Sequence, residues 1–385
     1  MLEAAFDNGN STIKMIIDTK EGSTSKQQKS VVSQILTVKK SSETDLKEAI
    51  ANIFDNMVVH IASKAIKRVG LYAVGEKAYS TGNRVRNMNI KVGEKHNDDI
   101  PVITSLAMIA ATAIQNSFNI SGDLPSELDI ELNYSTAIPA REYSADIAKE
   151  LEKRFMDGPH IVNFYVNNNI VVVRINIEKC KVTKEGTPAV FAIIEGDKEL
   201  LEDFNNRYEI NWKNKDFAEK KLLLVDIGDG TTELIYVVNG KPKADLSTGF
   251  RAGVGHAASS AKDLFDEYTK VKINMNRQQF MSVVLDEKHH YHAEADEAMK
   301  QANYIQSQEI FEQIEESFLD RLQGDVDVIV VFGGGAAEFR ESLFNDVAGF
   351  VDSVGSKVLW IPDEKAPTLN VDGLDILNKK VFFKK

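Results

Sequence analysis

The stretch Val225-Asp226-Ile227-Gly228-Asp229-Gly230-Thr231-Thr232-Glu233 decides the fold, because a similar pattern occurs once before it. The earlier copy reads Ala5-Phe6-Asp7-Asn8-Gly9-Asn10-Ser11-Thr12-Ile13-Lys14. Each copy places an Asp at the end of an apolar run, a Gly two residues later, and a hydroxyl residue four or five residues after the Asp. The two copies are separated by about the length of one domain with insertions. The repeat therefore predicts two related domains, each opening on strand, tight turn and strand.

The residue types in both turns suit phosphate binding. Glycines let several backbone N–H groups approach phosphate oxygens, and hydroxyl side chains add donors. Lys14 can place a positive charge on a phosphate, and Asp7 and Asp226 can face each other across a hydrated Mg²⁺. A single copy would equally fit an ordinary Asp-Gly hairpin, whereas two copies at domain spacing favour a nucleotide site. The residues expected to bind nucleotide here are Asp7, Gly9, Asn10, Ser11, Thr12, Lys14, Gly228, Asp229, Gly230 and Thr231.

A third motif follows the unbroken apolar run Val328–Phe332, where Gly333, Gly334 and Gly335 lead into an expected helix from about Ala336. A strand that ends in glycines lets the backbone pass close to a flat ring or an α-phosphate. The motif lacks the Lys-Ser/Thr of a P-loop, and no G-x-G-x-x-G opens a helix after the first strand. Gly253 also precedes an expected helix; it can approach the nucleotide sugar or simply form a tight turn.

Bulk properties narrow the class of protein. The chain has 385 residues, of which 43% are hydrophobic and 27% charged, as in an ordinary globular protein of two domains. Its net charge of −12 argues against extensive direct contact with DNA or RNA. No membrane span and no signal peptide are expected. The single cysteine, Cys180, fits a reducing cytoplasm, where we expect the protein to work.

The pattern of apolar residues alternates strands with helices and so predicts an α/β fold. Thr104–Phe118 is nearly apolar throughout and predicts a buried helix. Strands are expected near 128–132, 161–166, 170–177 and 189–194. A solvated loop is expected over Thr19–Ser30, and a helix over 43–65.

With these motifs in order, the chain resembles the superfamily of actins, sugar kinases and heat-shock chaperone ATPases. Asp7–Lys14 matches its first phosphate motif, Asp226–Thr231 its second, and Val328–Ala336 its adenosine motif. Within the superfamily, the chain is most similar to the ParM-like plasmid-segregation actins of bacteria. The resemblance covers nearly the whole chain in motif order and is loose between motifs. Asp229 departs from it, because many relatives have Gly there.

The resemblance implies an actin-like fold of two related domains, each with an inserted subdomain, with ATP or ADP and Mg²⁺ in the cleft between them. It implies ATP hydrolysis coupled to self-assembly into dynamic filaments, which segregate plasmid DNA through a DNA-binding adaptor protein. The segment Glu185-Gly186-Thr187-Pro188-Ala189 is similar to the one that connects the two ParM domains. Glu185 would then orient the attacking water, with Asp226 as the second catalytic residue. Glu142 is expected to be structural.

The expected layout is domain I over 1–205 with an insertion at about 32–95, and domain II over 206–365 with a mainly helical insertion at about 258–323. Residues 366–385 are expected to return to domain I. The alternative function is that of a monomeric small-molecule kinase on the same fold. The cluster His289, His290 and His292 fits a solvated helix end better than a metal site. Nucleotide preference, filament geometry and the polymer interface are not readable from the sequence.

Overall fold

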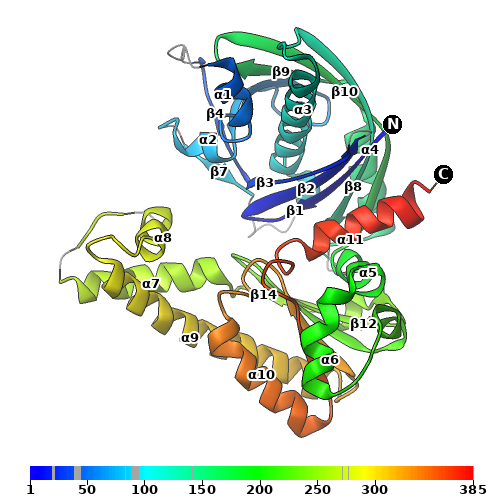
Figure 1. Cartoon of the computed structure of the whole chain (residues 1–385), viewed down its shortest axis with the longest axis vertical. Coiled ribbons are helices and arrows are strands. Elements are labelled where there is room, and N and C mark those ends of the chain that lie inside the picture. Colours follow the sequence, from blue (N-terminus) through cyan, green and yellow to red (C-terminus); the bar gives the residue numbers. More distant parts are fainter. Residues whose placement is uncertain are drawn as a thin grey trace. The chain divides into compact units, whose positions relative to one another are not determined.

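The computed structural model describes residues 1–19, 22–38, 45–82, 84–88, 95–139, 142–270, 272–275 and 277–384. The chain divides into two compact units. Unit 1 comprises Met1–Pro188 and Val371–Lys385, and unit 2 comprises Ala189–Asn370. The predicted insertion at 32–95 lies partly outside the described residues. Figure 1 labels many of the helices and strands of both units.

Unit 1 is built on one ten-stranded sheet in the order β3-β2-β1-β8-β10-β9-β5-β6-β4-β7. Its strands are β1 Leu2–Asn8, β2 Thr12–Thr19, β3 Gly22–Lys29, β4 Val31–Gln34, β5 Val58–Ala62, β6 Gly70–Val74, β7 Arg86–Asn87, β8 Glu127–Ile138, β9 His160–Val166 and β10 Asn169–Lys184. Its helices are α1 Leu46–Ala51, α2 Glu76–Tyr79, α3 Ile100–Ser121, α4 Ala145–Met156 and the short η1 Lys95–Asn97. The C-terminal segment adds most of α11 Leu369–Leu377 and η6 Asn378–Phe382.

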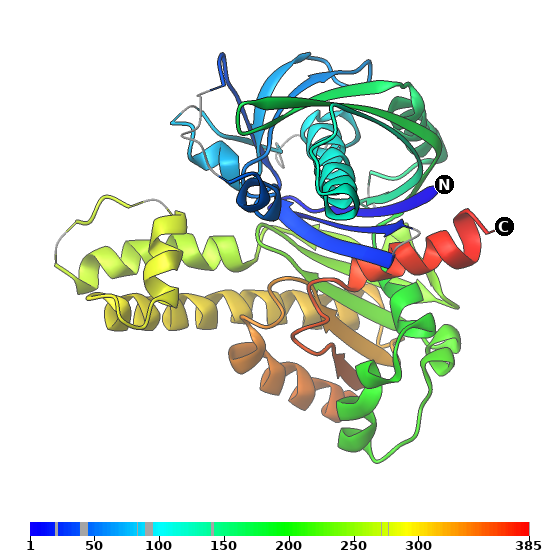
Figure 2. The same cartoon turned by 45° about the horizontal axis from the view of Figure 1, so that its top comes forward.

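The curled sheet of unit 1 wraps around α3, which Figures 1 and 2 show inside the curl. This helix confirms the buried helix predicted from Thr104–Phe118. It is long and apolar enough to span a membrane by length and composition, but 78% of its most apolar window is buried in the fold. The apolar side chains of α3 therefore belong to the core of unit 1, where the helix packs against strands of the sheet.

Unit 2 has a smaller sheet in the order β13-β12-β11-β15-β16, with β14 paired to β12. Its strands are β11 Leu222–Ile227, β12 Thr232–Val238, β13 Lys241–Pro242, β14 Thr248–Phe250, β15 Val328–Phe332 and β16 Lys357–Trp360. Its helices are α6 Glu202–Tyr208, α7 Val254–Tyr268, α8 Arg277–Leu285, α9 His292–Glu316 and α10 Arg340–Val354, with the short turns η2 Lys198–Leu201, η3 Asn214–Glu219, η4 Ala244–Leu246 and η5 Ser317–Arg321. Helix α5, Thr187–Glu195, carries the chain from unit 1 into unit 2. Strand β15 is buried at every position, as expected of a parallel strand covered on both faces.

The two sheets repeat one topology, as the sequence predicts. In unit 1, β1 pairs antiparallel with β2 and parallel with β8, and β8 pairs parallel with β10. In unit 2, β11 pairs antiparallel with β12 and parallel with β15, and β15 pairs parallel with β16. Asp7 and Asp226 therefore occupy equivalent positions, near the end of the first strand of each unit.

Several predicted elements are wrong. The polar stretch Thr19–Ser30 contains the edge strand β3, which forms a complete antiparallel ladder with β2. Its side chains are polar and mostly exposed, so the sequence pattern does not indicate a strand. The predicted helix over 43–65 contains only α1 before β5 begins. The predicted strand over 189–194 is helix α5, because its Val and Ile residues face the unit-2 core as a buried helix. The helix after the three glycines begins at Arg340 rather than near Ala336.

The unit boundaries also differ from the predicted ones, which fall after residues 205 and 365. The change to unit 2 comes after Pro188, because Ala189, Val190 and Ile193 join the core of unit 2. The return to unit 1 begins at Val371, which packs with Ala5, Ile16 and Leu374. Described strands of the region 32–95 extend the main sheet of unit 1 through the β9–β5 pair, and the region 258–323 holds α7, α8 and α9.

Candidate nucleotide site

The first turn joins β1 to β2 and holds six of the predicted residues. Asp7 pairs across the hairpin with Lys14, whose Nζ lies 3.9 Å from Asp7 Oδ2. Both side chains are largely covered, with 16% and 14% of their surface exposed. A Cβ on Gly9 would lie 2.5 Å from the Thr12 carbonyl oxygen, so this tight turn needs glycine. Asn10 and Ser11 complete the turn before Thr12 opens β2.

A buried polar network beneath this turn holds Asn8 in place. The Asn8 amide donates to Tyr134 Oη and Thr136 Oγ1, both at 3.0 Å, and its oxygen accepts from Ser105 Oγ at 3.3 Å. Ser105 also bonds Tyr134 at 2.9 Å. Burial raises the pKa of Tyr134, so its hydroxyl keeps its proton. The network joins β1, β8 and α3, and so fixes the base of the first turn on the rigid sheet.

Glu185, the predicted water-orienting residue, lies at the end of β10 in unit 1. Its backbone N–H donates to the Ile138 carbonyl at 2.8 Å. Its carboxylate accepts from Lys95 Nζ at 2.7 Å. Burial lowers the pKa of Lys95, but the charges of Glu185, Asp7 and Glu142 outweigh it and leave the pKa raised. Lys95 is therefore a protonated ammonium among carboxylates.

The second turn joins β11 to β12 in unit 2. The Gly228 N–H donates to the Thr231 carbonyl at 2.9 Å and closes a tight turn over Asp229 and Gly230. The start of α7 packs on this turn, where the Gly255 N–H donates to the Asp229 carbonyl at 2.8 Å. A Cβ on Gly253 would lie 2.5 Å from the Gly228 carbonyl oxygen. Gly253 therefore allows close backbone packing, which fits the second role expected for it, a tight turn.

The third motif lies directly beside Asp226. Strand β15 ends at Phe332, which pairs with Asp226 in the parallel register. Gly333 has φ +102°, and a Cβ there would lie 2.5 Å from the Ile227 carbonyl oxygen and closer still to Asp226 Oδ1. The Gly335 N–H donates to the Ile227 carbonyl at 2.7 Å, while a Cβ on Gly334 would meet open space. The glycines therefore let β15 end against the second turn.

Two further side chains hold the acidic groups of the second turn. Asn370 Nδ2 donates to Asp226 Oδ2 at 2.9 Å. Arg277 on α8 pairs with Asp229 Oδ2 at 3.1 Å. Asp229, the residue that departs from the resembled family, is therefore anchored to the helical part of unit 2.

These residues suit phosphate and Mg²⁺ by their chemistry. Each turn offers a carboxylate and hydroxyl oxygens of the kind that Mg²⁺ prefers, and the first turn adds the Lys14 ammonium. A Cβ on Gly9 would lie 2.5 Å from the Thr12 carbonyl oxygen, and a Cβ on Gly228 would lie 3.0 Å from the Thr231 carbonyl oxygen. Asp7 and Asp226 are the residues that would hold the metal. Within the described part of the chain, no cluster of three or more His, Cys, Asp or Glu is placed to bind a metal by itself.

The structure groups the predicted residues by unit and adds others that the sequence did not indicate. Unit 1 brings Glu185 into the same group of charges as Asp7, and unit 2 brings the glycines after β15 beside Asp226. Sequence reasoning missed Asn8, Lys95, Arg277 and Asn370. Asn8 is inside the quoted first motif, whereas Lys95, Arg277 and Asn370 carry no local signal.

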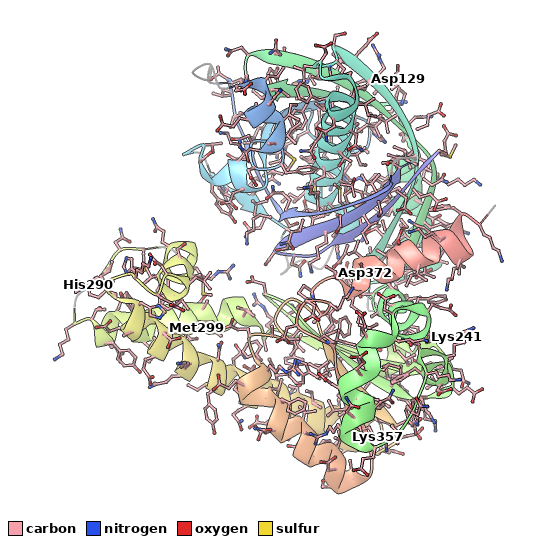
Figure 3. The ribbon with its side chains drawn as sticks, viewed as in Figure 1. Asp129, Lys241, His290, Met299, Lys357 and Asp372 are labelled. Carbon is pink, nitrogen blue, oxygen red and sulfur yellow. The ribbon has the colours of Figure 1, made fainter. Side chains whose placement is uncertain are left out.

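The histidine cluster is a surface feature, as expected. His289 and His290 are exposed, and Figure 3 shows His290 in the connection between α8 and α9. His290 stacks edge-on with Tyr291 at 4.7 Å between ring centroids.

Comparisons with known proteins agree with this architecture. Residues 224–345 match the family model of the archaeal actin homologue MreB-like, C-terminal. No curated protein sequence matches the chain. Similar solved structures include the actin-like protein Alp7A, with 18% identity, a TM-score of 0.69, and coverage of 97% of this chain and 95% of that one. The archaeal actin homologue Ta0583 has 14% identity and a TM-score of 0.65, covering 99% and 100%. Bacillus thuringiensis ParM with ATP has 15% identity and a TM-score of 0.63, covering 98% of each chain.

Proposed function

From the actin-like fold of this chain, we propose that it is an ATPase that binds Mg-ATP through its two Asp turns and assembles into dynamic filaments. We further propose that the filaments act in the cytoplasm and segregate plasmid DNA, with a DNA-binding adaptor protein making the contact to DNA.

The repeated turn at equivalent strand ends is the observation that carries the nucleotide proposal. Both units place an Asp near the end of the first strand and a glycine-dependent turn after it. A fold can need one such hairpin for its own geometry, but two with the same residue types favour a shared ligand. Bacillus thuringiensis ParM, which has the same fold, was solved with ATP, with ADP and with AMPPNP.

In this proposal, Mg-ATP supplies the phosphoryl group whose transfer to water the site accelerates. Lys14 and the backbone N–H groups of the turns would bind phosphate oxygens, and the carboxylates of Asp7 in unit 1 and Asp226 in unit 2 would each serve as a ligand for hydrated Mg²⁺. Glu185 orients the attacking water. Enzymes accelerate phosphoryl transfer mainly by positioning the reactants and by electrostatic stabilisation, and a polar side chain can position the water. Gly333, Gly334 and Gly335 border the adenosine.

Filament formation is supported by the fold and by the names of its relatives. One of the similar structures is a non-polymerisable mutant of a ParM, with 16% identity and a TM-score of 0.64. The plasmid role rests on the resemblance to ParM-like proteins. The charge of −12 supports an adaptor, because a protein that bound DNA directly would need clustered Lys and Arg.

The test is right-angle light scattering with Mg-ATP, Mg-ADP and no nucleotide, with phosphate release followed in parallel. We expect scattering to rise with Mg-ATP above a critical protein concentration, and phosphate release to follow it. Flat scattering at every concentration would refute the filament. ADP formation that is stimulated by a small metabolite and exceeds phosphate release would favour the kinase alternative instead.

A further inference from the structure

The most developed charge cluster in unit 1 centres on Lys95, a residue that neither the motifs nor the comparisons assign. Its ammonium donates to Glu185 Oε1 at 2.7 Å, and its own backbone N–H donates to Glu142 Oε2 at 3.2 Å. Only 10% of the Lys95 side chain and 19% of the Glu185 side chain are exposed. A covered ion pair of this length differs from the surface pairs of this unit, such as Lys64–Asp157 at 3.7 Å with 78% and 49% exposed.

The segment that carries Lys95 is held firmly from a second element. Arg154 on α4 donates to the carbonyls of His96 and Asp98, both at 2.8 Å, and to the carboxylate of Asp99. The same guanidinium donates to the Ala65 carbonyl at 2.6 Å. Arg154 therefore ties the turn after Lys95 to the body of unit 1, and Lys95 meets Glu185 from a fixed position.

Electrostatics explain why a cation is needed at this point. Asp7 and Glu142 act on Lys95 together with Glu185, so three carboxylates share its neighbourhood. Without the ammonium, repulsion from the neighbouring carboxylates would favour a conformer of Glu185 that leaves its present position. A carboxylate that turns away no longer holds the attacking water in position, and small displacements of such positioning groups lower the reaction rate by large factors.

We propose that Lys95 is a positioning residue for Glu185: it holds the Glu185 carboxylate in the position set by their ion pair, so that this side chain is oriented before nucleotide binds. The inference rests on the proposed ATPase function. It assigns to Lys95 an effect on the rate of hydrolysis and none on ground-state ATP binding.

The test uses Lys95→Gln, which removes the charge, and Lys95→Arg, which keeps it. Lys95→Gln is expected to lower kcat on the order of 30-fold with KM changed less than about twofold, whereas Lys95→Arg stays within about threefold of wild type. Adding Lys95→Gln to Glu185→Gln should lower kcat little further, because the residue it positions is already lost. Lys64→Gln, which breaks the exposed ion pair of the same unit, is the matched control and should leave kcat unchanged.

A second measurement does not depend on turnover. In nucleotide-free and metal-free protein, the shifts in Tm caused by Lys95→Gln and Glu185→Gln should be non-additive in the double variant. If Lys95→Gln lowers the yield of folded protein, Lys95→Arg decides the case by itself: because it keeps the charge, its Tm and kcat should stay near those of wild type, and a large loss of kcat in this variant would overturn the positioning role.

The outcomes separate cleanly. A kcat of Lys95→Gln equal to wild type, or additive Tm shifts, overturns the positioning role. A KM for ATP raised tenfold or more also overturns it, and makes Lys95 a phosphate ligand. If the wild-type protein neither binds nor hydrolyses ATP, both the proposed function and the role of Lys95 are wrong. If the wild-type protein hydrolyses ATP and the Lys95 variants are fully active, only the role of Lys95 is wrong.

Discussion

The two Asp turns share a sequence pattern and a topological position but differ in the charge that faces the aspartate. Across the first hairpin, Asp7 pairs with Lys14, a cation. Across the second, Asp226 pairs with Glu233, an anion. Residues paired in this way project on the same face of a sheet, where opposite charges stabilise and like charges destabilise. Unit 1 therefore carries its own counter-charge, whereas unit 2 places a second carboxylate opposite its aspartate.

This difference gives the two aspartates different surroundings. Asp226 accepts a hydrogen bond from the amide of Asn370, and a Cβ on Gly333 would collide with its carboxylate. Asp7 belongs to a group of charges that includes Lys14 and Lys95. We expect a substitution at either aspartate to change its interaction with the residue opposite it, which is Lys14 for Asp7 and Glu233 for Asp226.

The largest expected effect comes from Gly333→Ala, which attacks the packing that positions Asp226. The backbone there has φ +102°, and the new Cβ would press on Ile227 and on the Asp226 carboxylate. Strain and overpacking together should cost about 3 kcal/mol of unfolding free energy. Nucleotide affinity should fall as well, because Asp226 is displaced. Chemical denaturation and titration with a fluorescent ATP analogue measure the two effects.

Gly334→Ala is the matched control, because its Cβ meets nothing within 4 Å. It should stay within about 0.5 kcal/mol of wild type. Gly9→Ala should lower the unfolding free energy less than Gly333→Ala does, since the atoms nearest to its Cβ are all in the backbone of Thr12. Equal losses for Gly333→Ala and Gly334→Ala would break the claim that packing positions Asp226.

The next effect separates the two aspartates directly. Asp226→Asn should lower kcat on the order of 10²-fold, because in the proposed site it weakens the binding of the Mg²⁺ that would stabilise the reacting phosphate group, and Asp7→Asn should lower it less. Stability should move the other way. Without Mg²⁺, Asp226→Asn relieves the repulsion with Glu233 and should not lower Tm, whereas Asp7→Asn loses its attraction to Lys14.

Phosphate release over a range of Mg²⁺ concentrations, with Tm measured in EDTA, checks both parts. The comparison is wrong if Asp7→Asn is the more damaging change to kcat, or if Asp226→Asn lowers Tm in EDTA as much as Asp7→Asn does.

Sequence reasoning succeeded where a pattern is local and repeated. The Asp-Gly turns, the apolar run of β15 and the buried helix α3 are each encoded by neighbouring residues, and the structure has them at the expected places. It failed where long-range packing overrides local preference. The Val- and Ile-rich residues 189–194 read as a strand but form α5, and the polar residues of β3 read as a loop because an edge strand needs no apolar face.

The parts of the site that the sequence missed are contacts across the fold. Lys95 and Glu185 are 90 positions apart, and Asn370 and Asp226 are 144 apart. Neither Lys95 nor Asn370 carries a motif that marks its partner. Only the folded chain shows that Lys95 lies in the charge cluster of Asp7 and that the Asn370 amide donates to Asp226.

A smaller expected effect is a pH dependence of stability that arises in unit 1. His160 of unit 1 is buried, with Nδ1 2.6 Å from Ser63 Oγ and Nε2 2.7 Å from the Phe155 carbonyl. Burial lowers its pKa, outweighing the Phe155 carbonyl and Asp157. The neutral ring is thus the folded form, so stability is full above the unfolded pKa of about 6.5 and falls as pH drops, by at most about 1.4 kcal/mol per pH unit.

Hydrogen exchange of the full chain at pH 7.5 and 5.5 tests this difference between the units. Peptides of β5 and β9 should lose protection at pH 5.5 in wild type, and His160→Asn should remove this added sensitivity to acid. The exposed His290 of unit 2 provides the control, His290→Gln. An acid response of β5 and β9 that persists unchanged in His160→Asn would place its cause elsewhere.

The smallest expected effect concerns Arg277, a cation of unit 2 that pairs with Asp229. Arg277 and Asp229 lie 3.1 Å apart with 43% and 32% of their side chains exposed. Arg340 and Asp363 form a pair of the same length in the same unit, with 36% and 49% exposed. Exposed pairs contribute about 0–1 kcal/mol and less in high salt, so Arg277→Ala and Arg340→Ala should destabilise the chain equally little. Only Arg277→Ala should also weaken ATP binding, by about threefold or less and most at low salt, because Asp229 is part of the turn. ATP titrations at two salt concentrations measure this, and a loss above tenfold for Arg277→Ala would mean that unit 2 relies on this cation as unit 1 relies on Lys14.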